Sequence, residues 1–267
     1  MTRTIVASAI LLLCLTTTMT MTSFARNPET GFLNRTISVG GETYRYQVFI
    51  PANWNKRGKW PVILFLHGAG ERGDDGLLQT DVGIGHAIRQ TVARFPFVVV
   101  MPQCRKEKTW TQPEMQAQAL AALDRAMKEF RGDPARVYLT GLSMGGFGTW
   151  DLAAKYPRRF AALVVVCGGI TPPKMYPQMG GSLVSDPRIA DPYGETARVI
   201  GSTPVWIFHG DADPAVPVEE SRKMYAALQA AHGNVKYTEY PGVGHESWLK
   251  AYADPDLPIW LLQQHLH

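Results

Sequence analysis

The sequence has little cysteine and little charge of either sign. It contains three cysteines in 267 residues, and only 19% of its residues are charged. The 27 basic and 23 acidic residues leave a formal net charge of +4 and form no basic run. The sequence therefore lacks the electrostatic footprint of a nucleic-acid-binding protein. It also lacks internal repeats and low-complexity stretches.

What is present is the composition of a globular protein. Hydrophobic residues make up 45% of the chain, so wholesale disorder is excluded. The length suits one large domain or two small ones. A chain of this size buries roughly 75% of the surface that its unfolded form exposes. We therefore expect a sizeable hydrophobic core.

The first 25 residues have the pattern of a secretory signal peptide. Arg3 supplies the positive start, and residues 5–15 form an apolar run that is too short to span a bilayer comfortably. In Ser23-Phe24-Ala25, the first and third residues are small, as a signal peptidase site requires. The sequence thus predicts cleavage after Ala25, export to the periplasm or the exterior, no stable membrane span, and a mature domain over 26–267.

Removal of this segment would take Cys14 and leave two cysteines, Cys104 and Cys167. Two cysteines are too few for a zinc framework. Export would permit a disulfide between them. However, each follows an apolar run that looks like a different strand, and non-adjacent strands hold cysteines too far apart to bridge. We expect two free, partly buried thiols.

Apolar runs and helical patterns alternate along the chain. Continuous apolar runs are typical of strands buried on both faces, and alternation with helices implies right-handed crossovers. The sequence therefore predicts an α/β fold in a single domain, with a mostly parallel central sheet and helices on both faces. Strands are predicted at 44–50, 62–66, 98–101, 137–140, 163–166, 205–208 and 235–240, and helices at 80–94, 114–130, 147–155, 218–231 and 259–266.

Residues 168–204 interrupt this rhythm. The stretch is rich in proline and polar residues and lies just before the predicted strand at 205–208. Long connections of this kind are usually functional or disordered. Two interpretations stay open, a cap or specificity loop over the sheet ends and a solvated excursion.

The sharpest chemical signal is Gly141-Leu142-Ser143-Met144-Gly145-Gly146, which lies between a predicted strand and a predicted helix. In that context G-x-S-x-G describes a nucleophile elbow, in which a strained serine needs neighbours without side chains. The turn would expose the hydroxyl of Ser143 and place the N–H of Met144 at a helix N-terminus, where negative charge is favoured.

A serine hydroxyl needs a base and an orienting carboxylate. His245 lies in a glycine-rich loop after the last predicted strand, and His209 is the second choice of base. Asp211 and Asp213 both follow the strand at 205–208, and we favour Asp213 because Pro214 would hold it in an extended turn. The order Ser143, Asp213, His245 is that of the α/β-hydrolase triad.

The second oxyanion donor should come from the loop that follows the strand at 62–66. This loop, Leu66-His67-Gly68-Ala69-Gly70-Glu71-Arg72-Gly73, has small residues that let backbone N–H groups approach a reacting carbonyl. We assign the N–H of Ala69, with Gly68 and Gly70 as alternatives.

Taken together, these motifs resemble a known family. The 66–73 loop, Pro102-Gln103-Cys104 with Trp110, the elbow, and the segment 209–213 resemble α/β-hydrolase esterases related to the phospholipase/carboxylesterase, dienelactone hydrolase and prolyl oligopeptidase-like groups. Most specifically they resemble a bacterial "predicted peptidase" group, some of whose members behave as carboxylesterases. The resemblance runs from about Tyr44 to Leu249.

The resemblance implies a role for each matched residue. It implies Ser143 as nucleophile, Asp213 and His245 as its partners, and Ala69 and Met144 as oxyanion donors. Trp110 matches a position that walls the substrate pocket, although a plain packing role is an equal alternative.

We therefore expect a secreted serine hydrolase that cleaves small-molecule carboxylic esters with short acyl chains through an acyl-enzyme, without metal or organic cofactor. The alternatives are a peptidase of the prolyl oligopeptidase-like type, and an esterase that removes feruloyl or acetyl groups from polysaccharides. A non-catalytic binding module is a further alternative, which the complete set of triad residues disfavours.

Overall fold

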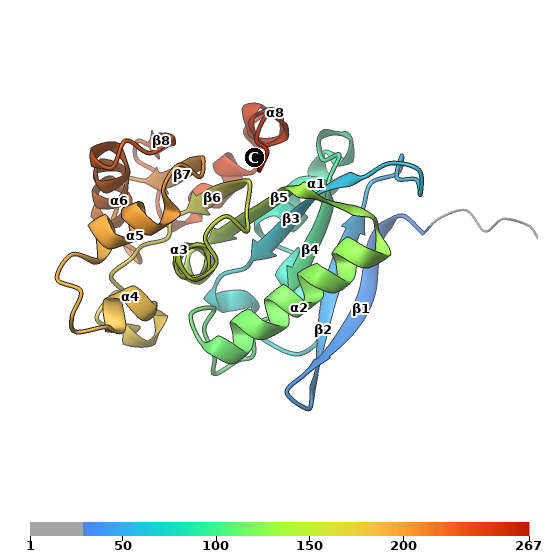
Figure 1. Ribbon diagram of the computed structural model, residues 1–267, viewed down its shortest axis with the longest axis horizontal. Helices are drawn as coiled ribbons and strands as arrows, with labels where there is room; N and C mark the ends of the chain where they lie inside the picture. Colours follow the sequence, from blue (N-terminus) through green and yellow to red (C-terminus); the bar gives the residue numbers. More distant parts are fainter. Residues whose placement is uncertain (1–28, 267) are drawn as a thin grey trace, which may run out of the picture.

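The computed structural model describes residues 29–266, and the predicted signal peptide with Cys14 lies outside them. One eight-stranded sheet in the order β1-β2-β4-β3-β5-β6-β7-β8 forms the centre of the molecule (Figure 1). The strands are β1 Gly31–Val39, β2 Glu42–Ile50, β3 Trp60–Leu66, β4 Val98–Pro102, β5 Gly132–Leu142, β6 Ala162–Val166, β7 Val205–Gly210 and β8 Val235–Tyr240.

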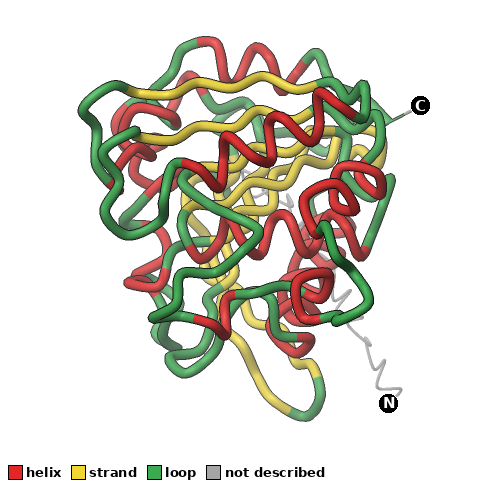
Figure 2. The backbone as a smooth tube through the Cα atoms, turned by 90° about the vertical axis from the view of Figure 1, so that its left-hand side faces the viewer, coloured by secondary structure: helices red, strands yellow, loops and turns green. Residues whose placement is uncertain are grey.

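Strands β3 to β8 are parallel, and the β1–β2 hairpin adds two antiparallel strands at one edge. All seven predicted strands are present, and β1 is an additional strand that no sequence pattern predicted. Its residues are only half-buried or exposed, so it lacks the continuous apolar run of the inner strands. The turn at Gly40–Gly41 extends beyond the rest of the sheet (Figures 1 and 2).

Helices cover both faces of the sheet, as predicted for this fold class. One buried cluster joins side chains of β3 to β7 to α2, α3, α5 and α6, and a second joins the opposite strand faces to α1, α7 and α8 (Figure 1). The helices are α1 Gly83–Gln90, α2 Pro113–Glu129, α3 Met144–Lys155, α4 Ser182–Ser185, α5 Pro192–Ile200, α6 Glu219–Ala230, α7 Trp248–Ala251 and α8 Asp256–Leu262.

The helix boundaries differ from the predicted ones where glycine or proline intervenes. The stretch 80–94 contains the short α1 followed by a separate 3₁₀ turn at Val92–Arg94, and α3 begins at Met144, three residues earlier than predicted. The earlier start matters because it puts the first helical N–H next to Ser143. The stretch 168–204 is not a solvated loop without secondary structure. It contains α4 and α5, and α5 packs on α3 and α6.

The cysteines and the helix lengths also bear on the sequence-based expectations. Cys104 and Cys167 are both free, as predicted, and both are fully rather than partly buried. None of the helices within residues 29–266 combines the length and the apolar character that a membrane crossing requires.

Candidate active site

Ser143 lies on the sharp turn between β5 and α3, at the edge where the parallel strands end. Its backbone has φ 51° and ψ −119°. This conformation is energetically unfavourable for any residue that has a side chain. Glycine is required on both sides of this turn. A Cβ atom on Gly141 would clash with the carbonyl oxygen of Gly145, and a Cβ atom on Gly145 would clash with that of Leu66.

The structure brings the three predicted triad side chains into one hydrogen-bonded chain. The Nε2 atom of His245 lies 2.9 Å from the Oγ atom of Ser143, and Nδ1 lies 2.7 Å from Oδ2 of Asp213. The three residues follow β5, β7 and β8, which end at the same edge of the sheet. A hydroxyl, an imidazole and a carboxylate in this order can pass a proton from the hydroxyl to the ring.

Asp213 is held as an anion by the protein around it. Burial alone would raise the pKa of this carboxyl, but hydrogen bonds from His209, His245 and the backbone N–H of Val216 outweigh burial and hold the pKa well below its usual range. The other oxygen, Oδ1, accepts the N–H groups of Ala215 and Val216 at 2.8 and 3.0 Å. Asp213 therefore stays ionised, with both oxygens fixed in place.

His209, the second choice of base, has a different position. Its ring is fully buried, and Nε2 lies 3.2 Å from Oδ2 of Asp213 and 3.1 Å from the carbonyl oxygen of Val216. Both partners are acceptors, so Nε2 carries the proton, and Nδ1 accepts the hydroxyl of Ser221 at 2.7 Å. His209 thus orients Asp213 from behind, a role that the strand-end pattern gave no reason to expect.

Two backbone N–H groups near Ser143 lie at the start of helical turns. Met144 is the first residue of α3, and Ala69 is the first residue of the short 3₁₀ turn Ala69–Glu71, so neither N–H has a partner within its own helix. The ideal Cβ position of Gly68, just before Ala69, lies 3.8 Å from Cβ of Ser143, so this loop borders the nucleophile. Arg72 holds the loop in shape because its Nε donates to the carbonyl of Ala69 at 2.9 Å.

Trp110 supports this loop from beneath. Its indole N–H donates to the carbonyl of His67 at 2.9 Å, and the side chain is only 1% exposed. This burial favours the packing alternative over a wall of the substrate pocket, because a ring with so little exposed surface offers little contact to a ligand. The motif at 102–104 also supports the 66–73 loop, because the N–H of Cys104 donates to Nε2 of His67 at 2.9 Å.

His67 is a buried histidine that must stay neutral. Its Nε2 accepts the Cys104 N–H, so Nδ1 carries the proton and donates to the carbonyl of Gly68 at 2.6 Å. Complete burial lowers the pKa of His67 from 6.5 to about 4. Protonation would therefore disrupt the loop that carries Ala69.

This shift predicts acid sensitivity of folding. Between pH 6.5 and 4 the unfolded chain binds a proton at His67 that the folded chain does not, so stability falls as the pH falls through this window. The loss is roughly 3 kcal/mol, and it levels off below pH 4. Urea unfolding at several pH values should show it, and His67→Gln should flatten the dependence. An equal pH dependence in both proteins would contradict the assignment.

The insertion between β6 and β7 is tied down by two buried carboxylates. Oδ1 of Asp151, on α3, accepts the N–H and the hydroxyl of Ser182 at 2.7 and 2.8 Å. Oε2 of Glu220, on α6, accepts the N–H groups of Ile170 and Thr171 at 3.0 and 2.8 Å. The insertion therefore packs onto α3 and α6, held at its start by Glu220 and near its middle by Asp151.

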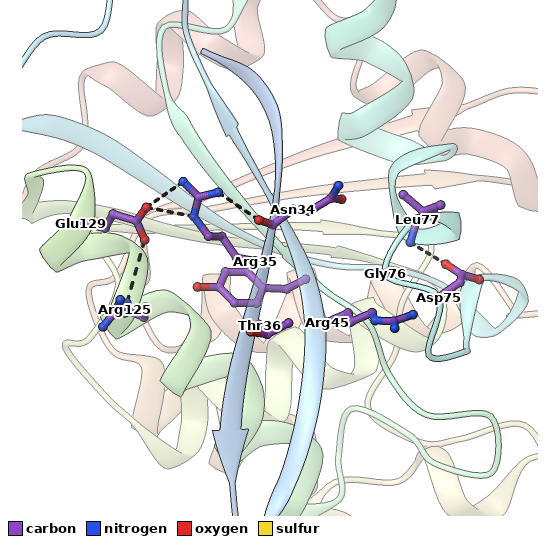
Figure 3. Close-up of a pocket in the computed structure, with 10 residues that line it drawn as sticks. Asn34, Arg35, Thr36, Arg45, Asp75, Gly76, Leu77, Arg125 and Glu129 are labelled. Carbon is purple, nitrogen blue, oxygen red and sulfur yellow. Dashed lines mark hydrogen bonds and ion pairs between the residues drawn. The ribbon is translucent and has the colours of Figure 1, made fainter. Parts of the chain in front are cut away.

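A cavity of about 570 Å³ lies at the β1 edge of the sheet, and no triad residue lines it (Figure 3). Its lining side chains come from β1, β2, α2 and the loop at 75–77. Figure 3 shows Arg35 paired with Glu129, and Nε of Arg35 donates to Oε1 of Glu129 at 2.9 Å. Charge in this cavity is thus partly neutralised by the protein itself, and the cavity is separate from the candidate active site.

Comparison with known proteins places this geometry in a family. The model of the dienelactone hydrolase family matches residues 79–254, which is more than half of the chain and includes the elbow, Asp213 and His245. The chain belongs to the dienelactone hydrolase family. The α/β-hydrolase fold and the esterase-related group that the sequence motifs predicted are thereby confirmed.

Two relatives of this dienelactone hydrolase family member cover most of it. An uncharacterized secreted protein of Arthroderma benhamiae is 28% identical over 86% of this chain, and a thermostable esterase of known structure is 31% identical over 88%, with a TM-score of 0.73. The chain spans only 26% of the length of the fungal protein and 63% of that of the esterase.

A more distant structure shares the fold alone. The acylaminoacyl peptidase of Pyrococcus horikoshii aligns over 89% of this chain and 42% of its own, with a TM-score of 0.67 and 16% identity. The same fold therefore occurs in a protein named as a peptidase and in one named as an esterase, so the substrate has to be argued from the site.

Proposed function

We propose that this protein is a carboxylesterase-type serine hydrolase that cleaves small-molecule carboxylic esters through an acyl-enzyme. The observation that carries the proposal is the continuous hydrogen-bonded chain from Ser143 through His245 to the ionised Asp213. Family membership and the esterase among the similar structures support it.

In the proposed reaction Ser143 Oγ attacks the ester carbonyl carbon while Nε2 of His245 takes the hydroxyl proton. The imidazolium that forms is stabilised by the carboxylate of Asp213 at Nδ1. Collapse of the tetrahedral intermediate breaks the bond to the leaving alkoxide, which takes the proton from His245. Water then attacks the acyl-enzyme by the same route and releases the acid, so the cycle needs no metal or organic cofactor.

The N–H groups of Met144 and Ala69 are proposed to bind the oxyanion. Both begin helical turns, and the helix dipole of α3 adds partial positive charge at Met144. Because these donors belong to the backbone of a rigid turn, they cost little reorganisation when charge develops.

Export is proposed together with this activity. The signal-peptide pattern at 1–25 supports it, and so does the name of the fungal relative, which is described as secreted. Cleavage after Ala25 would release the mature domain 26–267. N-terminal sequencing of the protein recovered from a secreting host would test the cleavage site.

A panel of p-nitrophenyl esters from acetate to palmitate tests the activity. We expect acetate and butyrate esters to be hydrolysed fastest. This expectation follows the short-acyl prediction made from the sequence. The small cavity beside α3, whose lining includes Phe147 and Asp151, contains no triad residue and does not define the acyl site.

The panel is extended by feruloyl esters, acetylated xylan and N-acylated peptide anilides. Turnover of the anilides at a rate comparable with the esters would favour the peptidase alternative, and exclusive turnover of feruloyl or acetylated substrates would favour the polysaccharide alternative. An absence of turnover on every substrate would overturn the proposed function.

A further inference from the structure

Cys167 lies directly behind the candidate triad. It follows β6 at the same sheet edge as Ser143, has φ 39°, and is fully buried. Its sulfur, a carboxylate oxygen of Asp213 and a ring nitrogen of His245 all lie within 4.8 Å of one another. The proposed ester hydrolysis gives this thiol no role.

These three donor types are those that zinc prefers. Thiolate sulfur, imidazole nitrogen and carboxylate oxygen bind Zn²⁺ at about 2.0–2.3 Å, which places tetrahedral ligands roughly 3.4 Å apart. Spacings of at most 4.8 Å therefore need only small side-chain movements to close around an ion. The thiolate also biases the site toward soft cations and against Mg²⁺ and Ca²⁺.

A second, independent feature points into the same place. The hydroxyl of Ser247 is completely buried, and the sulfur of Cys167 that it faces is a weak acceptor that leaves it without a hydrogen bond of normal geometry. A buried polar atom without a partner costs free energy unless something satisfies it. A metal-bound water or the metal itself would give this oxygen a partner.

We propose that Cys167, Asp213 and His245 form an inhibitory site for a thiophilic divalent cation, with Zn²⁺ as the reference ion. The inhibitory effect rests on the proposed function, whereas the binding of the ion does not. Asp213 and His245 belong to both the proposed triad and the metal site, whereas the thiol belongs to the metal site alone. Binding of the metal would therefore lower the esterase activity.

Inhibition follows from the two nitrogens of His245. Nδ1 is bound to Asp213 and Nε2 to Ser143, so a cation on either nitrogen removes a hydrogen bond that the proposed proton transfer needs. The ion binds the ring nitrogen that carries the lone pair, so a cation at Nδ1 requires the ring proton to move to Nε2. The thiolate binds the ion as well, and the thiol proton passes to solvent.

The surroundings of Cys167 also set the protonation state of its thiol. Burial raises the pKa of the Cys167 thiol, and the nearby Asp213 carboxylate raises it further. The N–H of Ser143 and the hydroxyl of Ser247 act in the opposite direction. The thiol is therefore protonated without metal, and binding of a cation has to displace its proton.

The first test is a zinc titration of p-nitrophenyl acetate hydrolysis by the full chain, without an affinity tag that binds metal. Each variant is normalised to its own metal-free rate. We expect Cys167→Ala to raise the half-inhibitory zinc concentration at least about tenfold. The matched control is Cys104→Ala, which removes the other buried thiol and should keep the sensitivity of the parent. Mg²⁺ should not inhibit either protein.

The second test measures binding without turnover, so that a failed esterase assay does not decide it. Co²⁺ added to the Ser143→Ala protein should produce a thiolate-to-cobalt charge-transfer band, and Cys167→Ser should abolish that band. Melting curves check that each variant is folded, and Cys167→Ser replaces Cys167→Ala in the titration if the latter is not. Equal zinc sensitivity with and without the thiol, or a cobalt spectrum without the band, would overturn the proposal.

Discussion

Replacement of Ser143 by alanine is expected to lower kcat for p-nitrophenyl acetate by about 10⁴–10⁶-fold, the range typical of a lost serine nucleophile. The physical reason is that no other hydroxyl is hydrogen-bonded to His245 among the described residues. Alanine adopts the same backbone angles at the same cost as serine, so the melting temperature should change little. Steady-state kinetics and circular dichroism measure the two effects.

Ser202→Ala is the matched control for this variant. Ser202 is exposed and lies in the turn after α5, outside the candidate site, and its replacement should leave kcat within about twofold. A Ser143→Ala protein that is folded and keeps more than a hundredth of the activity would contradict the nucleophile assignment.

Replacement of Asp213 by asparagine is expected to lower kcat by about 10⁴-fold, the loss seen when the triad carboxylate becomes an amide. Oδ2 of Asp213 accepts from His245, and an amide nitrogen in that position would donate instead. His245 would then expose a protonated Nε2 to Ser143 and could not accept its proton. The KM value should change far less than kcat, because the carboxylate is buried away from the substrate.

The Asp211→Asn variant tests which of the two aspartates orients His245, since both were candidates in the sequence. Asp211 accepts the N–H of Gly242 at 2.7 Å and holds the loop before His245, so its amide variant keeps an acceptor and should lose less than about tenfold in kcat. A larger loss in Asp211→Asn than in Asp213→Asn would reverse the assignment of the orienting carboxylate.

The fold and the outline of the candidate site could be predicted from local patterns. The inner strands are continuous apolar runs because both of their faces are buried, and the glycines at 141 and 145 mark the elbow because backbone atoms pass where a Cβ would lie. Once the strands are known to be parallel, the segments that follow them must meet at one edge of the sheet. These are properties of short segments and of chain direction.

The rest depends on contacts between segments far apart in the sequence. Strand β1 pairs with β2 at an edge, where one-sided burial removes the apolar signal, and Trp110 is buried under a loop 43 residues away. His209 orients Asp213, and Cys167 lies behind both Asp213 and His245, only because neighbouring strands place them side by side.

The sequence by itself therefore determined the fold class, the strained turn at Ser143 and the identity of the candidate chemical groups. The reason is that burial periodicity and glycine sterics are local. Only the tertiary structure decided which aspartate faces His245, which histidine is buried behind it and which thiol lies next to both. Packing and hydrogen-bond partners across the sheet edge depend on distances that a linear pattern does not contain.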